Sequence, residues 1–242
     1  MSAPAAAASV ASGMATQAIT PLVSLPLPVQ IIHLCAALLL LLAFAMLAQR
    51  RVANLVSLFA AQGVLLVISA AVVGYSTHQA ELYQSAVLTL VIKVIILPWV
   101  LFKLIHRLRA DWEMETLVNI PSQQLIGIVL VIFAFVVVQP IAQFTGANMR
   151  GVLGIALALV LLAFLMMIVR HTAIAQVVGF LSMENALLFA ATSATKGMPM
   201  VVELGIGLDV LVGVFVLGIF FFQIREQFDS LDLQHMESLK DD

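Results

Sequence analysis

The chain has a single cysteine and few charged residues, and these shortages exclude several classes of function. Cys35 has no second cysteine with which to form a disulfide, and no cysteine cluster is present to bind iron–sulfur centres or structural zinc. The sequence also lacks a glycine-rich nucleotide-binding loop and a Ser/His/Asp arrangement. We therefore expect no cofactor in this chain and no redox or hydrolytic chemistry by this chain alone.

Charge is scarce over most of the sequence. Only 10% of the 242 residues are Asp, Glu, Lys or Arg, whereas 63% are hydrophobic. This composition lies outside the range of soluble globular proteins and predicts a polytopic membrane protein in contact with the lipid bilayer. No basic patch indicates a nucleic-acid partner. Residues 1–27 contain no Lys or Arg, so they lack the charged start of a cleavable signal and are expected to form an Ala-rich arm.

Seven apolar runs are long enough to cross roughly 30 Å of hydrocarbon, which takes about 20 helical residues. Because irregular backbone cannot face lipid, each run is expected to be a helix, and the fold class is all-α. The runs cover approximately residues 28–48, 52–74, 82–106, 122–143, 151–169, 172–194 and 200–223.

A weak internal similarity divides the chain into two halves. Residues 54–63 align with residues 176–185, which places Gln62 opposite Glu184, and the next helix places Lys93 opposite Asp209. Helices one to three and five to seven run in the same directions, so a parallel repeat of two three-helix units is predicted. The predicted parts are the arm 1–27, the first unit with a cytoplasmic loop 28–121, a linking helix 122–150, and the second unit with its cytoplasmic tail 151–242.

Basic residues at the helix ends predict the orientation, because cytoplasmic loops of inner-membrane proteins carry an excess of Lys and Arg. Only Arg150 and Lys196 fall on one side, and Lys93 lies within the membrane. The N-terminus is therefore expected outside and the C-terminus in the cytoplasm. The basic residues on the expected cytoplasmic side are Arg50, Arg51, Lys103, Arg107, Arg109, Arg170, Arg225 and Lys240.

Three ionisable residues lie near the middle of predicted spans: Lys93, Glu184 and Asp209. A charged side chain at the centre of a bilayer costs roughly 2.5–3.5 kcal/mol on insertion scales, so such residues are candidates for a functional site by default. Glu203 lies nearer the outer end of the last span and is either an access point for Asp209 or an interface residue. The three central residues are candidate members of a proton relay.

Other polar residues are candidates for supporting roles. Pro98 follows Lys93 by five residues, and a proline there can kink the helix and open backbone carbonyls near the lysine. Gln139 precedes Pro140 near the end of the fourth span, where the pair is either a polar break or a helix terminator. Gln62 and Asn185 complete the set.

A purely structural interpretation stays open beside the relay. Lys93 and a carboxylate could form a buried pair that only holds helices together, in which case the chain is a structural spacer. The relay uses the same groups, since a buried carboxyl group that takes up and releases protons can be controlled by a nearby movable positive charge.

At these residues the sequence resembles a known family, the membrane component E of hydrogenase 4. That family is related to the K subunit of respiratory NADH:quinone oxidoreductase and to the C subunit of multisubunit cation/proton antiporters. The resemblance covers nearly the whole chain beyond residue 30. Its motifs are IKVIILP at 92–98, VVVQP at 136–140, GFLSMEN at 179–185, VELGIGLD at 202–209 and LDLQHMESLK at 231–240.

The resemblance implies a non-catalytic, proton-translocating subunit in the membrane arm of a complex-I-like hydrogenase. Glu184 then matches the first intramembrane glutamate of the family, and Asp209 stands where the K subunit has its second. The implied partners are antiporter-like membrane subunits, other membrane-arm subunits and a soluble hydrogenase arm that carries nickel–iron and iron–sulfur centres. An ion transporter without a redox arm is the alternative from the same resemblance.

Overall fold

The computed structural model describes residues 26–77, 80–108, 118–145, 147–170 and 172–194. Helices α4, η2 and α5 follow one another without a break, and η2 is a seven-residue π-helix. No β-strand occurs in these ranges. The elements are α2 (Leu27–Ala48), α3 (Val52–Thr77), α4 (Ala80–Thr89), η2 (Leu90–Ile96), α5 (Leu97–Leu108), α6 (Ile120–Thr145), α7 (Ala147–Val169) and α8 (Ala173–Ala194).

The predicted all-α membrane fold is confirmed for the described part of the chain. Six helical segments are long and apolar enough to span a bilayer, and they coincide within a few residues with the first six predicted runs. The seventh predicted run, 200–223, lies outside the described residues, as do residues 1–25 of the predicted arm. The count of seven spans and the internal repeat therefore stay predictions.

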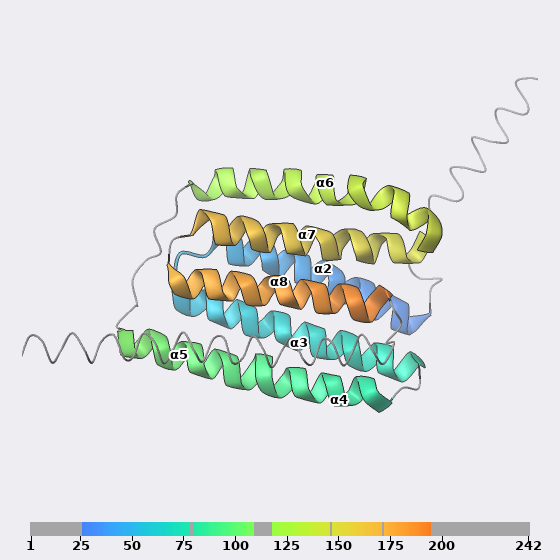
Figure 1. The fold of residues 1–242 in the computed structure, drawn as a ribbon, viewed down its shortest axis with the longest axis horizontal. Coiled ribbons are helices and arrows are strands. Elements are labelled where there is room, and N and C mark those ends of the chain that lie inside the picture. Colours follow the sequence, from blue (N-terminus) through green and yellow to red (C-terminus); the bar gives the residue numbers. More distant parts are fainter. Residues whose placement is uncertain (1–25, 78–79, 109–117, 146, 171, 195–242) are drawn as a thin grey trace, which may run out of the picture.

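The six segments lie side by side and run alternately in opposite directions (Figure 1). α2 packs against α3 and α7, and α8 packs against α3 and α7, so these four helices form the centre of the bundle. α6 packs along α7 and α2 at one edge, while α4, η2 and α5 pack along α3 at the opposite edge.

Burial follows this arrangement. Leu39, Leu55, Phe59 and Phe189 are among the fully buried apolar side chains between the central helices. The edge helix α6 instead exposes a row of large apolar side chains, which includes Leu125, Val129, Ile132, Phe133 and Val136. A soluble protein rarely leaves so large an apolar surface in water, so this surface is suited to contact with lipid or membrane partners.

Several hydroxyl groups within the spans donate to the backbone of their own helix. Ser69 donates to the Leu66 carbonyl at 2.8 Å, and Thr192 donates to the Leu188 carbonyl at 2.9 Å. These bonds satisfy the hydroxyl protons inside an apolar environment, so serine and threonine are tolerated there. Such residues need no functional explanation.

Candidate functional site

The candidate site begins at the π-helix η2, whose residues include Lys93. An α-helix would bring the ring of Pro98 against the carbonyl of Val94, four residues earlier. The chain avoids this clash by widening the helix, and the Leu97 amide donates to the carbonyl of Ile92, five residues back. The kink that the sequence predicts at Pro98 therefore takes the form of a π-helix, which the sequence reasoning did not foresee.

Pro98 also removes a backbone hydrogen-bond donor close to Lys93. In a π-helix the Lys93 carbonyl would accept from the N–H of residue 98, and in an α-helix the Val94 carbonyl would accept from the same N–H. Residue 98 is a proline, which has no N–H to donate. Residue 98 therefore supplies a donor to neither carbonyl. Backbone oxygens beside Lys93 can accept hydrogen bonds from another source.

Gly63 allows α3 to approach η2 closely at the same level. A Cβ added at Gly63 would lie 3.1 Å from Val94 Cγ2 and 3.5 Å from Lys93 Cβ. The first distance is tighter than most real contacts of a Cβ atom, so only glycine fits without a shift of the neighbouring side chain. Small residues at helix crossings have this role in membrane proteins generally.

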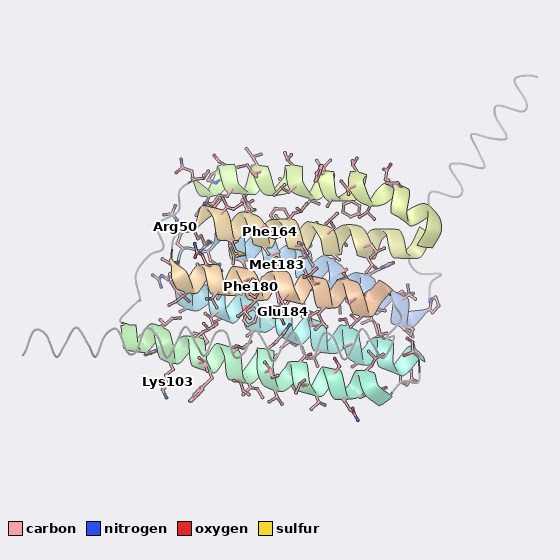
Figure 2. All side chains as sticks on the ribbon, in the orientation of Figure 1. Arg50, Lys103, Phe164, Phe180, Met183 and Glu184 are labelled. Atoms are coloured by element: carbon pink, nitrogen blue, oxygen red, sulfur yellow. The ribbon has the colours of Figure 1, made fainter. Side chains whose placement is uncertain are left out.

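Lys93 forms an ion pair with Glu184 across the bundle. The Lys93 Nζ atom lies 3.6 Å from Glu184 Oε2, and the two side chains are 0% and 2% exposed. Glu184 lies near the middle of α8 and of the length of the bundle (Figure 2). The structure therefore joins two of the three central charges that the sequence predicts, and it places them where both are shielded from lipid.

A second buried polar contact joins α8 to α3. Ser182 Oγ on α8 donates to Gln62 Oε1 on α3 at 2.9 Å, and both side chains are buried. Gln62 is the neighbour of Gly63, and Ser182 precedes Glu184 by two residues. The predicted supporting residue Gln62 is thus part of the site, whereas Ser182 was not foreseen although it stands in the same motif as Glu184.

Asn185 is a further buried polar side chain of this region. It is 2% exposed, and neither its amide nitrogen nor its amide oxygen has a hydrogen-bond partner within the described ranges. A primary amide can make four hydrogen bonds, and burying one without partners is costly. The predicted supporting residue Asn185 therefore has unused hydrogen-bonding capacity next to the ion pair.

The remaining predicted site residues fall elsewhere. Gln139 is exposed on the edge helix α6, which packs on α7 and α2 and not on the helices of the ion pair, and α6 continues through Pro140 to Thr145. The sequence-based idea of a helix terminator at Pro140 is therefore wrong. Asp209 and Glu203 lie outside the described residues, so their predicted roles in the relay remain untested.

Arg170 has a structural role that the sequence reasoning missed. Its Nη2 atom donates to the carbonyls of Met46 at 2.9 Å, Leu47 at 3.1 Å and Gln49 at 2.7 Å, which are the last carbonyls of α2 and the residue after it. Burial lowers the pKa of Arg170 to about 10, so the guanidinium stays charged near neutral pH. A cation at this position neutralises the negative end of the helix dipole and adds a donor to carbonyls at the end of α2, of which the Met46 carbonyl also accepts from the Gln49 amide.

Three exposed basic side chains of the described residues, Arg50, Arg51 and Lys103, also lie at helix ends. Figure 2 shows Arg50 and Lys103 at one end of the helices, and both are exposed there, as is Arg51. The Lys103 ammonium lies 5.0 Å from the centre of the Trp99 ring. Paired tryptophan and lysine side chains are typical of the boundary between lipid and water.

No group of three or more His, Cys, Asp or Glu side chains gathers in the described part of the chain in a way that could hold a metal ion. The described residues offer a buried contact between a carboxylate and an ammonium group, a second buried contact between a hydroxyl and an amide, and the buried amide of Asn185. Such groups can hold and transfer protons.

Comparison with known proteins places the chain in a family. No protein family model matches the sequence, and no solved structure matches it either. The chain is 32% identical over 204 residues to uncharacterized protein Rv0085 of Mycobacterium tuberculosis, and the match covers 84% of this chain and 93% of that protein. At this identity and coverage, the chain belongs to the same protein family as uncharacterized protein Rv0085.

Proposed function

We propose that the chain is a proton-translocating subunit in the membrane arm of a complex-I-like, membrane-bound hydrogenase. The observation that carries this proposal is the buried ion pair between Lys93 on the π-helix and Glu184 on α8. Ionisable residues inside a membrane are expensive, and those that are kept commonly line a proton route. The motif resemblance to component E of hydrogenase 4 supplies the type of complex.

The pair offers a way to couple proton movement to a change of shape. A proton that reaches Glu184 neutralises the carboxylate and removes its attraction for Lys93. The lysine is then free to turn toward a different acceptor, and Asp209, which the sequence motif places in the next span, is the acceptor we propose. Return of Lys93 to Glu184 would help to discharge the proton, so that charge passes sideways through the bundle.

The π-helix provides the mobility that this exchange requires. π-Helices are less regular than α-helices and occur frequently at functional sites. Because no N–H is present at Pro98, the backbone near Lys93 loses less hydrogen bonding when it shifts than a regular helix would lose. We propose that η2 is the segment that moves when redox chemistry in partner subunits drives the cycle.

The parallel repeat is part of the same proposal. Its first unit would be α2, α3 and the continuous segment α4, η2 and α5, and its second unit would begin with α7 and α8. The helices that the repeat would make equivalent are in contact, α2 with α7 and α3 with α8. Gln62 and Glu184, which the repeat aligns, both belong to the site.

The proposed orientation places the end with Arg50, Arg51 and Lys103 in the cytoplasm. This follows from the excess of basic residues at that end, and the membrane is then the inner membrane. The proposed partners are antiporter-like membrane subunits and a soluble arm that holds the nickel–iron and iron–sulfur centres. The exposed apolar face of α6 is available for lipid or for a membrane subunit.

The test is proton transport by the purified native complex in sealed vesicles. We expect nickel-containing and antiporter-like subunits to copurify, and we expect hydrogenase turnover to acidify the vesicle lumen. Glu184→Gln should abolish acidification while assembly is kept, whereas Gln139→Ala, on exposed α6, should leave it unchanged. Copurification with antiporter-like subunits alone would favour the ion transporter without a redox arm.

A structural spacer is the second candidate, and the ion pair itself favours it, because a buried pair can serve only to align helices. In that case the assembled Glu184→Gln complex should acidify vesicles at the full rate. The same measurement therefore separates the two functions.

A further inference from the structure

The outward side of the continuous segment α4, η2 and α5 carries an aliphatic stripe between two aromatic residues. The segment lies at an edge of the bundle and packs along α3 (Figure 1). Tyr83 and Trp99, at the two ends of the stripe, are 44% and 62% exposed. Between residues 85 and 98 every exposed side chain is aliphatic, and these side chains are Val87, Leu90, Val91, Ile95 and Ile96.

This order of side chains is typical of a surface that faces lipid. Tyrosine and tryptophan are enriched at both boundaries between membrane and water. Tyr83 and Trp99 are 16 positions apart, which is about 24 Å of helix and most of the roughly 30 Å thickness of the hydrocarbon core. Contacts between membrane helices are enriched in small residues, and none of the five exposed aliphatic residues is small. The stripe is therefore suited to acyl chains rather than to another helix.

A cation follows the stripe at one of its ends. Lys103 lies one turn beyond Trp99, is exposed, and points away from the bundle (Figure 2). Its ammonium group lies 5.0 Å from the centre of the Trp99 ring. The acidic residues of the described ranges are Glu81, in the first turn of α4, and Glu184, which is buried beside Lys93. Within these ranges the Lys103 end of the segment is therefore positive, with no carboxylate to neutralise it.

We propose that Trp99 and Lys103 bind an anionic phospholipid of the surrounding bilayer. The acyl chains lie along Val91 and Ile95, and Lys103 donates to the phosphate. The cation–π contact with Trp99 holds the ammonium group at the level of the headgroups. Basic side chains next to a membrane attract anionic lipids, and salt screens this attraction. The site does not depend on the proposed proton relay.

Tryptophan fluorescence tests the site, because the chain has only two tryptophans, Trp99 and Trp112. Trp112→Phe leaves Trp99 as the single fluorophore of the full-length chain. The variant is reconstituted into vesicles of equal parts phosphatidylglycerol and phosphatidylcholine. The acyl chains of one lipid are brominated in one preparation, and those of the other lipid in a second preparation. Bromine quenches a tryptophan that it contacts, so the ratio of the two quenching efficiencies reports the lipid composition around Trp99.

We expect phosphatidylglycerol to be enriched around Trp99 by about fivefold over the bulk bilayer, the effect of one basic side chain near an anionic surface. The enrichment should fall toward one at about 1 M salt. Lys103→Gln should also remove it. The matched control is Arg50→Gln, at an exposed position at the same end of the bundle, which should leave the enrichment unchanged.

The other end of the stripe supplies a second control. In a chain with Trp99→Phe and Trp112→Phe, Tyr83→Trp places the fluorophore on α4, whose residues include no Lys, Arg or His. Both lipids should quench this tryptophan equally. Equal quenching of Trp99 by the two lipids, or an enrichment that survives Lys103→Gln, would overturn the proposal. Quenching of Trp99 by neither lipid would also overturn it, because protein, such as a partner subunit or residues 109–117, would then cover the site.

Discussion

Lys93 and Glu184 come from segments that are 91 positions apart in the chain, yet their charged atoms lie 3.6 Å apart in the interior of the bundle. A buried pair of this kind contributes little net stability, because its attraction is offset by the loss of hydration of both charges. Removing one partner is nevertheless costly, since the other charge is left without compensation. This asymmetry allows the structural role of the pair to be separated from its functional role.

We expect Lys93→Met to destabilise the protein by about 3–5 kcal/mol, because Glu184 would be left uncompensated. The double variant Lys93→Met with Glu184→Gln should recover most of this loss, since no charge remains in the site. The measurement is Tm in detergent for the two single variants and the double variant. A double variant no more stable than Lys93→Met would show that the pair does not determine stability in this way.

The same double variant tests function. If the charges carry protons, the stabilised double variant should assemble and still fail to acidify vesicles. Full acidification by it would show that the pair is only an architectural feature.

The packing between α3 and η2 predicts a graded response at Gly63. Gly63→Ala should be tolerated after a small movement of Val94, whereas Gly63→Leu should push η2 away and cost about 1–3 kcal/mol. The matched control is Gly151, where an added Cβ meets no atom within 4 Å, so Gly151→Ala should leave Tm unchanged or raise it slightly. Equal effects of alanine and leucine at Gly63 would contradict the close approach.

Restoring a backbone donor at residue 98 should shorten the π-helix. In Pro98→Ala the clash with the Val94 carbonyl is absent and an N–H is available, so the α register becomes accessible. A shift of one residue in register turns Lys93 by about 100° away from Glu184. We expect slower proton transport without loss of assembly, and an electron-microscopy structure of the variant would reveal the register. An unchanged π-helix would refute proline as its cause.

Arg170 predicts a large effect at the end of α2. Arg170→Ala removes three hydrogen bonds from a charged donor and leaves the Leu47 and Gln49 carbonyls to find other partners, whereas the Met46 carbonyl keeps the Gln49 amide, so a loss of about 3 kcal/mol is expected. Arg50→Ala, at an exposed site at the same end, should change stability by less than about 0.5 kcal/mol. Comparable Tm shifts for the two variants would argue against the capping role of Arg170.

The contact between Ser182 and Gln62 should contribute modestly. Hydrogen bonds between membrane helices are worth about 0.6 kcal/mol on average, because the separated helices find other partners. A double-mutant cycle with Ser182→Ala and Gln62→Leu measures the coupling directly. A coupling free energy near zero would show that the hydrogen bond between the two side chains does not stabilise the protein.

The sequence by itself determined the helical membrane architecture. Runs of about 20 apolar residues can satisfy their backbone in lipid only as helices, so the six described spans could be predicted from composition and length to within a few residues. The cost of burying charge also marked Lys93 and Glu184 as candidate site residues before any contact was known.

Only the tertiary structure decided which polar residues meet. Spacing along a helix does not say which helix lies alongside, so the pairing of Lys93 with Glu184 and of Ser182 with Gln62 depended on α3 packing between η2 and α8. The separation of Gln139 from the site followed from the place of α6 at the edge. The capping role of Arg170 could not be predicted from the sequence, because the carbonyls that accept its hydrogen bonds lie more than 120 positions away, at the end of α2.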